Sequence, residues 1–325
     1  MPDTRSPLAG TLIVLTAASL FATLGVLSRF AYERGMDPTA FVAWRAGLAT
    51  VALLAVVWWR VGRSGRTLVR LASLSTRERG AVGVAIACGL LLNLAIFGAF
   101  ERTTIALALL GFYTYPAMVA AVTVALGREP LTRAVVIALA VAVCGMILVL
   151  VGGLDPTGEF RFDAFGIGLA LGAAACQTVF VIVSRDYRRV PADQAMTLIL
   201  AGTFAACVAL SLWADGDDAL LRPLREPGVL PILAAAGVLG AAIPSLLFLV
   251  GIRLIGGTRA GILMLFEPVV GVGLAAILLG ESLGPIQAAG GAAILAAALI
   301  LQRAPAHRAP AAEEEPIAVP APGGP

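Results

Sequence analysis

The sequence has no lysine, a single histidine and few charges, since only 13% of its 325 residues are charged. Without lysine, the chain cannot form the Gly-x-x-x-x-Gly-Lys loop by which many pumps bind ATP. The histidine, His307, lies in the C-terminal tail, which excludes a histidine-based metal centre or catalytic triad inside the apolar part. An intramembrane enzyme needs a nucleophile–base pair or a metal, so we expect no enzyme, no cofactor and no metal.

The four cysteines also lack the spacing of a metal site. Each falls within an apolar stretch and is interpreted as a small buried hydrophobic residue; they are Cys88, Cys144, Cys176 and Cys207. The net charge of +3 is no signature of nucleic-acid binding, because the informative feature in an apolar chain is where its arginines lie.

Apolar residues dominate what remains. They make up 59% of the chain, and the mean hydropathy is +0.94, whereas soluble domains are about half apolar and a quarter charged. A membrane helix needs about 20 mostly apolar residues. We therefore predict an all-α integral membrane protein with ten transmembrane helices, over residues 8–30, 38–59, 80–100, 104–126, 132–152, 164–184, 194–214, 229–251, 258–279 and 284–302.

The spans divide into two units of five. Gly152-Gly153 and the polar segment 155–163 separate a first repeat, 8–152, from a second, 164–303. Because each repeat has an odd number of spans, the second enters the membrane from the opposite side, which predicts an inverted repeat suited to alternating access. The remaining residues, 304–325, are rich in proline and alanine and are predicted to form a disordered cytoplasmic tail.

The arginines predict the orientation of the spans. With a cytoplasmic N-terminus, 16 of the 23 arginines lie in inner segments and 6 in outer segments, while Arg45 lies within a span. This distribution follows the positive-inside rule. We predict a multi-pass protein of the cell inner (plasma) membrane with both termini in the cytoplasm.

One stretch occurs twice, with a proline near the middle of the fourth span of each unit. Ala108–Pro116 and Ala260–Pro268 correspond at an offset of 152, and each proline precedes a glutamate, Glu129 or Glu281, by 13 residues. Proline removes a helix hydrogen bond, so it frees the carbonyl four residues earlier. Paired interrupted helices point to a transporter's central site. The alternative is that Pro116 and Pro268 are packing kinks without function.

This pattern resembles the drug/metabolite transporter superfamily, and specifically its EamA-type ten-helix transporters. The resemblance covers about residues 8–303 and rests on the duplicated unit, the two prolines, and Arg128-Glu129 and Gly280-Glu281 after them. The first copy reads Gly-Arg-Glu where Gly-Glu is usual. The resemblance implies a central cavity between the halves and secondary transport, often export, of amino acids, related metabolites or drugs.

Two ionisable residues lie within predicted spans, where a charge is costly and therefore a functional candidate. Glu267 lies about ten residues into the ninth span, close to the midplane, where burial favours the protonated acid. Arg45 lies in the outer half of the second span beside Trp44. Glu267 could instead form a structural hydrogen bond, and Arg45 could extend to the outer headgroups.

Neutral polar residues within the spans complete the candidate site for substrate or ion. Asn93, Tyr113, Tyr115 and Gln177 are predicted neighbours of Glu267, with interhelical hydrogen bonding as the alternative. The proline helices are expected to line the shared cavity. Pro244, in the eighth span, is a third candidate gating residue, with a simple kink as the alternative.

The predicted function is a secondary active transporter that exports small metabolites by alternating access, with the proton as candidate coupling ion. Its partners are a small-molecule substrate and the lipid bilayer. Small residues in the fifth and tenth spans allow close helix contact, either within one chain or in a homodimer. The alternatives are uptake rather than export, and a non-transporting structural or regulatory membrane protein.

Overall fold

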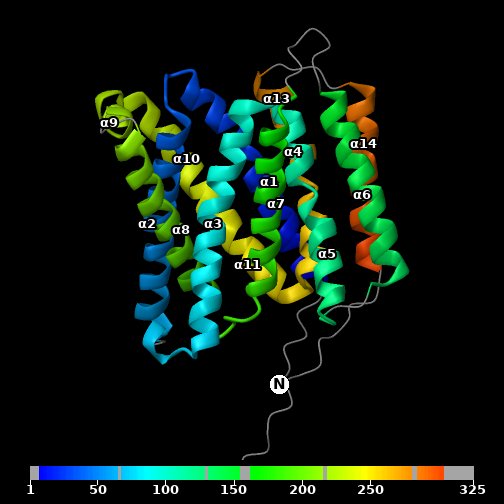
Figure 1. Ribbon diagram of the computed structural model, residues 1–325, viewed down its shortest axis with the longest axis horizontal. Helices are drawn as coiled ribbons and strands as arrows, with labels where there is room; N and C mark the ends of the chain where they lie inside the picture. The colour runs from blue at the N-terminus through cyan, green and yellow to red at the C-terminus, as the bar shows by residue number, and fades with distance from the viewer. Residues whose placement is uncertain are drawn as a thin grey trace, which may run out of the picture.

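The computed structural model describes residues 7–64, 67–128, 131–153, 162–214, 218–279 and 284–303. Within these ranges, ten helical stretches are long and apolar enough to cross a membrane, as predicted. Figure 1 shows these helices packed side by side in a bundle. Glu129, Glu281 and the tail, 304–325, lie outside the described residues.

Seven of the ten spans are single helices, and three are interrupted. The single helices are α1 (Pro7–Tyr32), α2 (Pro38–Ser64), α3 (Thr76–Arg102), α6 (Arg133–Gly152), α7 (Ala164–Val183), α8 (Ala192–Ala214) and α14 (Pro285–Arg303). The interrupted spans are α4 (Ile105–Phe112) with α5 (Tyr115–Ala125), α10 (Leu230–Gly237) with α11 (Ile243–Ile255), and α12 (Gly257–Met264) with α13 (Glu267–Leu279). A short helix, α9 (Asp218–Arg225), precedes α10.

The two proline-bearing spans break at equivalent positions. The first break separates Phe112 from Tyr115, and the second separates Met264 from Glu267, which is the same offset of 152 that relates the two sequence stretches. At each break the backbone makes a tighter turn. Thr114 N–H donates to the Gly111 carbonyl, and Leu265 N–H donates to the Ile262 carbonyl, each three residues back. The prediction that Pro116 and Pro268 accompany interrupted helices is therefore confirmed, while their role in gating stays a prediction.

Spans that correspond between the halves pack against one another. Helix α2 lies on α8, α5 on α12, and α6 on α14. The other main contacts come in matched pairs, since α3 packs on α7 as α11 packs on α1, and α4 and α5 pack on α7 as α12 and α13 pack on α1. These main contacts are thus the same when the first five spans are exchanged with the second five.

The corresponding spans that pack on each other run in opposite directions. On α2, Gly47 packs against Phe204 of α8, whereas Arg60, further along, contacts Asp193 near the start of α8. Helices α6 and α14 behave alike, because Gly145 faces Gly290 while the end of α6 meets the beginning of α14. Opposed directions of this kind are what an inverted repeat requires.

The close approach of α6 and α14 explains the small residues of the fifth and tenth spans. A Cβ atom at Gly290 would lie 2.5 Å from the Gly145 carbonyl oxygen and 2.8 Å from the Val149 nitrogen. These glycines are therefore used within one chain, where they allow two helix backbones to touch.

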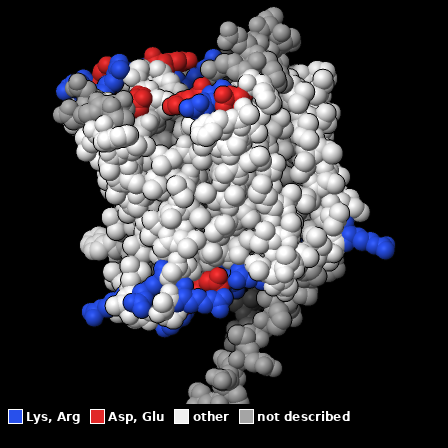
Figure 2. Space-filling view, in the orientation of Figure 1, with Lys and Arg blue, Asp and Glu red and all other residues white. Residues whose placement is uncertain are grey.

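On the face shown in Figure 2, charged side chains lie at the two ends of the bundle, with an uncharged band between them. We call the end where α1, α3 and α8 begin the basic end, because arginines gather there. The predicted cytoplasmic location of this end stays a prediction.

Pro244 lies near the start of α11, just after a π-helical turn over Val238–Ala242. The wider turn accommodates a proline that cannot donate a hydrogen bond to the Gly240 carbonyl. Gly240 also lies against Leu24 of α1, where a Cβ atom would approach a Leu24 methyl carbon to 2.4 Å. The eighth span is therefore irregular where it meets α1.

Candidate functional site

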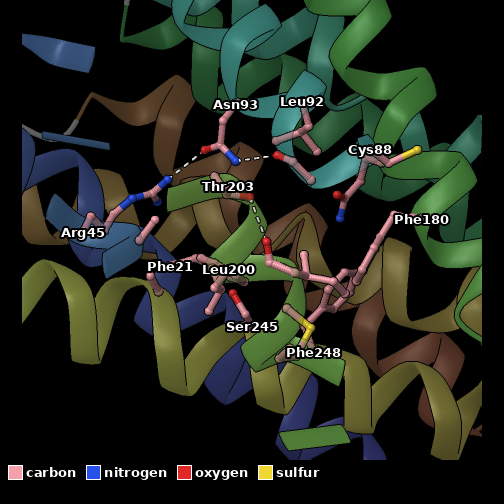
Figure 3. A pocket seen from close by; sticks show the side chains of 16 residues that line it. Phe21, Arg45, Cys88, Leu92, Asn93, Phe180, Leu200, Thr203, Ser245 and Phe248 are labelled. Carbon is pink, nitrogen blue, oxygen red and sulfur yellow. Dashed lines mark hydrogen bonds between the residues drawn. The ribbon is translucent and has the colours of Figure 1, made fainter. Parts of the chain in front are cut away.

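A cavity of about 160 Å³ lies inside the bundle, between α1, α2 and α3 of the first half and α7, α8 and α11 of the second. Its volume is several times the roughly 30 Å³ that one water molecule occupies in the liquid. The same three spans of each half contribute to it, as expected for a site at the interface of two repeats. Figure 3 shows the side chains that line it.

Arg45 reaches the cavity from α2, and α3 holds its side chain in place. An Arg45 Nη2–H group donates to the Asn93 Oδ1 atom at 2.8 Å, and the Asn93 amide in turn donates to the Gly89 carbonyl at 2.7 Å. The predicted alternative, an Arg45 that extends to the headgroups, is not what the structure shows. Arg45 turns inward instead (Figure 3).

The Arg45 guanidinium has no acidic partner in the described part of the chain, where no carboxylate oxygen lies within 4.0 Å of it. Its Nε atom is buried and makes no hydrogen bond. Buried charges are ordinarily paired, because removing an ion from water is costly. An arginine left in this condition at the wall of a cavity is a candidate for binding an anionic group.

Two neutral polar side chains also face the cavity with unused hydrogen-bonding groups. Gln177 on α7 and Ser245 on α11 line the cavity, and neither side chain has a hydrogen-bond partner among the described residues. Gln177 was a sequence candidate, whereas Ser245 was not. Thr203 lines the cavity too, but its hydroxyl already donates to the Ile199 carbonyl.

The remainder of the wall is mainly apolar. In Figure 3 the Arg45–Asn93 pair stands on one side of the cavity, and the rings of Phe180 and Phe248 stand on another. Phe21 contributes a third ring. Ligand pockets commonly combine such apolar walls with a few placed polar groups.

Trp44 does not contribute to the cavity. Its indole N–H donates to the Leu220 carbonyl of α9 at 2.8 Å, so the ring ties α2 to the short helix. Successive residues of a helix are 100° apart, so Trp44 and Arg45 face different neighbours. The structure therefore places Trp44 as an anchor for α9 rather than beside Arg45 in the site.

Glu267 lies in a second polar cluster, apart from the cavity lining. Its half-buried side chain lies near Tyr113, and Tyr115 lies close to both. Both tyrosines are buried, and the Phe112 ring lies 5.4 Å from each ring. The structure thus brings Tyr113 and Tyr115 to Glu267 as expected, but it places Asn93 and Gln177 with Arg45 instead.

The interrupted helices contact each other beside this cluster. Gly261 of α12 packs against Tyr115 and Pro116, and the Thr123 and Thr258 hydroxyl oxygens lie 3.1 Å apart in a buried hydrogen bond. None of the residues 113–116 or 265–268 lines the cavity. The expectation that the proline helices line it is therefore not met by this cavity.

Helices α1 and α7 connect the two regions. Helix α1 packs on α12 and α13 and supplies Phe21 to the cavity, while α7 packs on α4 and α5 and supplies Gln177. Thr178, next to Gln177, places its hydroxyl 3.5 Å from the Tyr115 carbonyl oxygen. Both helices therefore touch a broken span and also line the cavity.

Ion pairs join the two halves at the basic end. Nitrogen–oxygen distances range from 2.5 to 3.5 Å in four pairs, Arg60–Asp193, Arg77–Asp186, Arg128–Asp186 and Arg189–Glu78. By contrast, Arg29–Glu33 and Arg222–Glu226 at the opposite end each connect residues four positions apart at the end of one helix, within one half. The pairing of the halves at the basic end was not predicted, because it depends on which loops meet.

Tyr187 and Arg253 lie beneath these ion pairs. Tyr187 is fully buried, burial raises the pKa of its hydroxyl above the ordinary value, and the Arg253 guanidinium lies 5.6 Å from the ring centre. Arg253 also donates to the Val190 carbonyl at 2.9 Å. These contacts tie α11 to the segment between α7 and α8 and close the bundle there.

An all-helical bundle with ten helical stretches of membrane-spanning length defines a class, the multi-pass membrane proteins. The sequence profile described as "EamA-like transporter family" matches residues 8–151 and 164–303. The chain therefore belongs to the EamA-like transporter family, and it is a transporter rather than an enzyme.

Relatives from bacteria and archaea agree with this assignment. "Uncharacterized transporter YcbK" of Bacillus subtilis (strain 168) is 25% identical over 88% of this chain and 90% of its own length. An "Uncharacterized transporter" of Archaeoglobus fulgidus is 27% identical over 90% of this chain and 95% of its own. "Threonine/homoserine exporter RhtA" of Escherichia coli (strain K12) is 30% identical over 49% of this chain and 51% of its own.

A solved crystal structure shares the fold. It superposes with a TM-score of 0.74 at 19% identity and covers 91% of this chain and 96% of that chain. This likeness concerns the arrangement of helices alone.

Proposed function

We propose that the protein is a secondary active transporter of the cell inner membrane that exports small metabolites by alternating access through the cavity. The observation that carries the proposal is the position of the cavity, which is lined by corresponding spans of both halves. In an inverted repeat, a site at this interface can be exposed to either side when one half moves against the other. Export and amino-acid-like substrates are supported by the partial similarity to RhtA.

In this proposal the two halves, residues 8–152 and 164–303, are inverted repeats and both termini are cytoplasmic. The ion pairs of the basic end then close the cytoplasmic side of the cavity. They must break when the transporter opens inward, and the helix breaks near Pro116 and Pro268, with the irregular turn before Pro244, are where the spans would bend.

Proton coupling is assigned to the cluster of Glu267, Tyr113 and Tyr115. A carboxyl group inside the membrane can take up and release a proton, and this one lies at a helix break. Because α1 packs on α13 and also lines the cavity, protonation of Glu267 can influence the cavity without contact between proton and substrate.

The proposal is tested by reconstituting the purified protein into liposomes and measuring uptake of radiolabelled threonine and homoserine, the solutes named for RhtA. Saturable flux that is stimulated by unlabelled solute on the far side is expected of a carrier. A structural or regulatory membrane protein would give no flux above that of empty liposomes for any solute in a broader metabolite panel.

The orientation can be checked with reporter fusions. We expect fusions after residues 75 and 303 to report a cytoplasmic location, and fusions near residues 157 and 218 to report an external one, because the arginine-rich segments stay inside. A cytoplasmic signal at 157 would contradict the arrangement of five spans followed by five inverted spans.

Asp193→Asn should open the basic end. The Arg60–Asp193 ion pair is largely buried and joins α2 to α8, so removing the Asp193 carboxylate weakens the contact between the two halves at this end. We expect faster modification of Cys88, which lines the cavity, by a membrane-impermeant thiol reagent from the cytoplasmic side. The measurement uses a variant that retains only Cys88.

The control for this experiment is Glu226→Gln, which removes an exposed carboxylate at the opposite end and should leave the rate unchanged. Adding Arg60→Gln to Asp193→Asn should return the rate towards that of the parent, because two neutral amides can pack together without burying a charge. Equal rates in the parent and in Asp193→Asn would show that this ion pair does not hold the cavity closed.

A further inference from the structure

The cavity carries charge of one sign only. Arg45 is the single charged residue among the described residues that line it, and none of those residues is acidic. A site for a cationic solute would require a carboxylate or an aromatic cage, and here the nearest polar groups to the open space are a guanidinium and neutral side chains. The electrostatic preference of the cavity is therefore for an anion.

From this arrangement we propose that Arg45 binds the carboxylate of an amphipathic monocarboxylic acid, whose apolar part packs between Phe180 and Phe248. The inference deepens the proposed transport function and rests on it for treating the cavity as the substrate site. A guanidinium presents a planar fork of donors that matches a carboxylate. One such group balances a monoanion, whereas a phosphate dianion would need a second cation.

The hydrogen bonds already made by Arg45 favour this role. Asn93 Oδ1 accepts from one Nη2–H group and so fixes the plane of the guanidinium, while the remaining donors, including the unpaired Nε–H, have no partner in the described chain. Asn93 is thus a positioning residue, because its own amide donor is engaged by Gly89.

Gln177 and Ser245 define what else the solute can carry. Their unused groups can donate to or accept from a hydroxyl, carbonyl or amino group on the solute. An amino acid is therefore permitted, but its ammonium group meets only neutral acceptors. The charge that the site recognises is the carboxylate, and the amine is dispensable.

The test measures binding to the full-length protein in detergent, by calorimetric titration at fixed pH and constant sodium chloride. Three probes share one aromatic group: phenylacetate, phenylacetamide and phenethylamine. We expect phenylacetate to bind at least about 30-fold more tightly than the amide or the amine, a difference of about 2 kcal/mol. Tighter or equal binding of phenethylamine would overturn the proposal.

Substitutions at two arginines of α2 test whether Arg45 causes the preference for phenylacetate. Arg45→Gln should weaken phenylacetate binding by about 30-fold and erase the preference over phenylacetamide, while Arg45→Lys should keep the preference with weaker binding, since lysine lacks the fork. Arg63→Gln changes an exposed arginine on the same helix and should bind like the wild type. Unchanged phenylacetate binding by folded Arg45→Gln would refute the assignment.

Two further outcomes separate this inference from the transport proposal. If phenylacetate binds through Arg45 but liposomes show no flux of any solute, the carboxylate site stands and the transport function fails. If liposomes transport solutes that lack a carboxylate as fast as those that have one, the transport function stands and the carboxylate site fails. If chloride, added in place of another anion at constant ionic strength, displaces phenylacetate, Arg45 binds simple anions and the proposal is overturned.

Discussion

We expect Glu267→Gln to insert and fold like the wild type but to lose proton-driven transport. The residue begins α13, directly after the break in the ninth span, and its half-buried side chain lies near Tyr113. Glutamine keeps the shape and size of the side chain, so packing at the break is preserved. It cannot exchange a proton, however, so an imposed pH gradient should no longer raise the flux above the rate measured without a gradient.

The measurement compares solute flux in liposomes with and without an imposed pH gradient, over a range of external pH. Exchange of labelled for unlabelled solute without a gradient should persist in Glu267→Gln, because the cavity with Arg45 is intact. Tyr113→Phe removes the hydroxyl that faces the carboxyl and should change the pH dependence while coupling remains.

Glu33→Gln is the matched control, since it makes the same chemical change in an exposed carboxylate at the end opposite the basic end. It should leave the flux and its pH profile unaltered. A Glu267→Gln protein with the pH profile of the wild type would mean that Glu267 is structural and that coupling takes place elsewhere.

The separation of Glu267 from the cavity bears on how transport would be coupled. With proton and substrate at different places, one site can affect the other only through an element that has two arrangements. Helices α1 and α7 meet this requirement, because each packs on an interrupted span and also lines the cavity. The two helices occupy equivalent places in their halves, so a shift of one relative to the other would change the cavity.

The helical spans could be predicted from the sequence because lipid imposes a simple rule on them. Every backbone polar group within the membrane must be satisfied internally, so a run of about 20 apolar residues becomes a helix. The breaks at residues 113–114 and 265–266 follow equally directly from Pro116 and Pro268. Local chemistry alone determines both features.

The composition of the cavity could not be predicted in the same way. The hydrogen bond between Arg45 and Asn93 joins residues 48 positions apart and depends on how α2 and α3 are rotated. Apolar spans carry no polar face from which that rotation can be read, so Phe180, Ser245 and Phe248 were missed. Trp44 was grouped with Arg45 because the two are adjacent in sequence, although neighbouring helix positions face different directions.

The contact between α6 and α14 leads to a second large expected effect, on folding rather than on transport. We expect Gly290→Leu to prevent accumulation of well-folded protein. Gly290 is buried, and a Cβ atom there would lie 2.5 Å from the Gly145 carbonyl oxygen, 2.8 Å from the Val149 nitrogen and 2.9 Å from the Leu148 Cβ atom. Two of these three atoms belong to the backbone and cannot rotate away, so the helices must separate along their length.

Gly168→Leu on α7 is the matched control. Gly168 is exposed, and nothing lies within 4 Å of the position that a Cβ atom would take. There, leucine adds apolar surface towards lipid and replaces a poor helix former, so stability should be unchanged or slightly higher.

The readouts are monodisperse yield in detergent and the midpoint of thermal unfolding. Overpacking costs about 1–3 kcal/mol in typical cores, and a leucine forced against backbone atoms should exceed that range. If Gly290→Leu and Gly168→Leu unfold at the same temperature, α6 and α14 do not pack backbone to backbone as described.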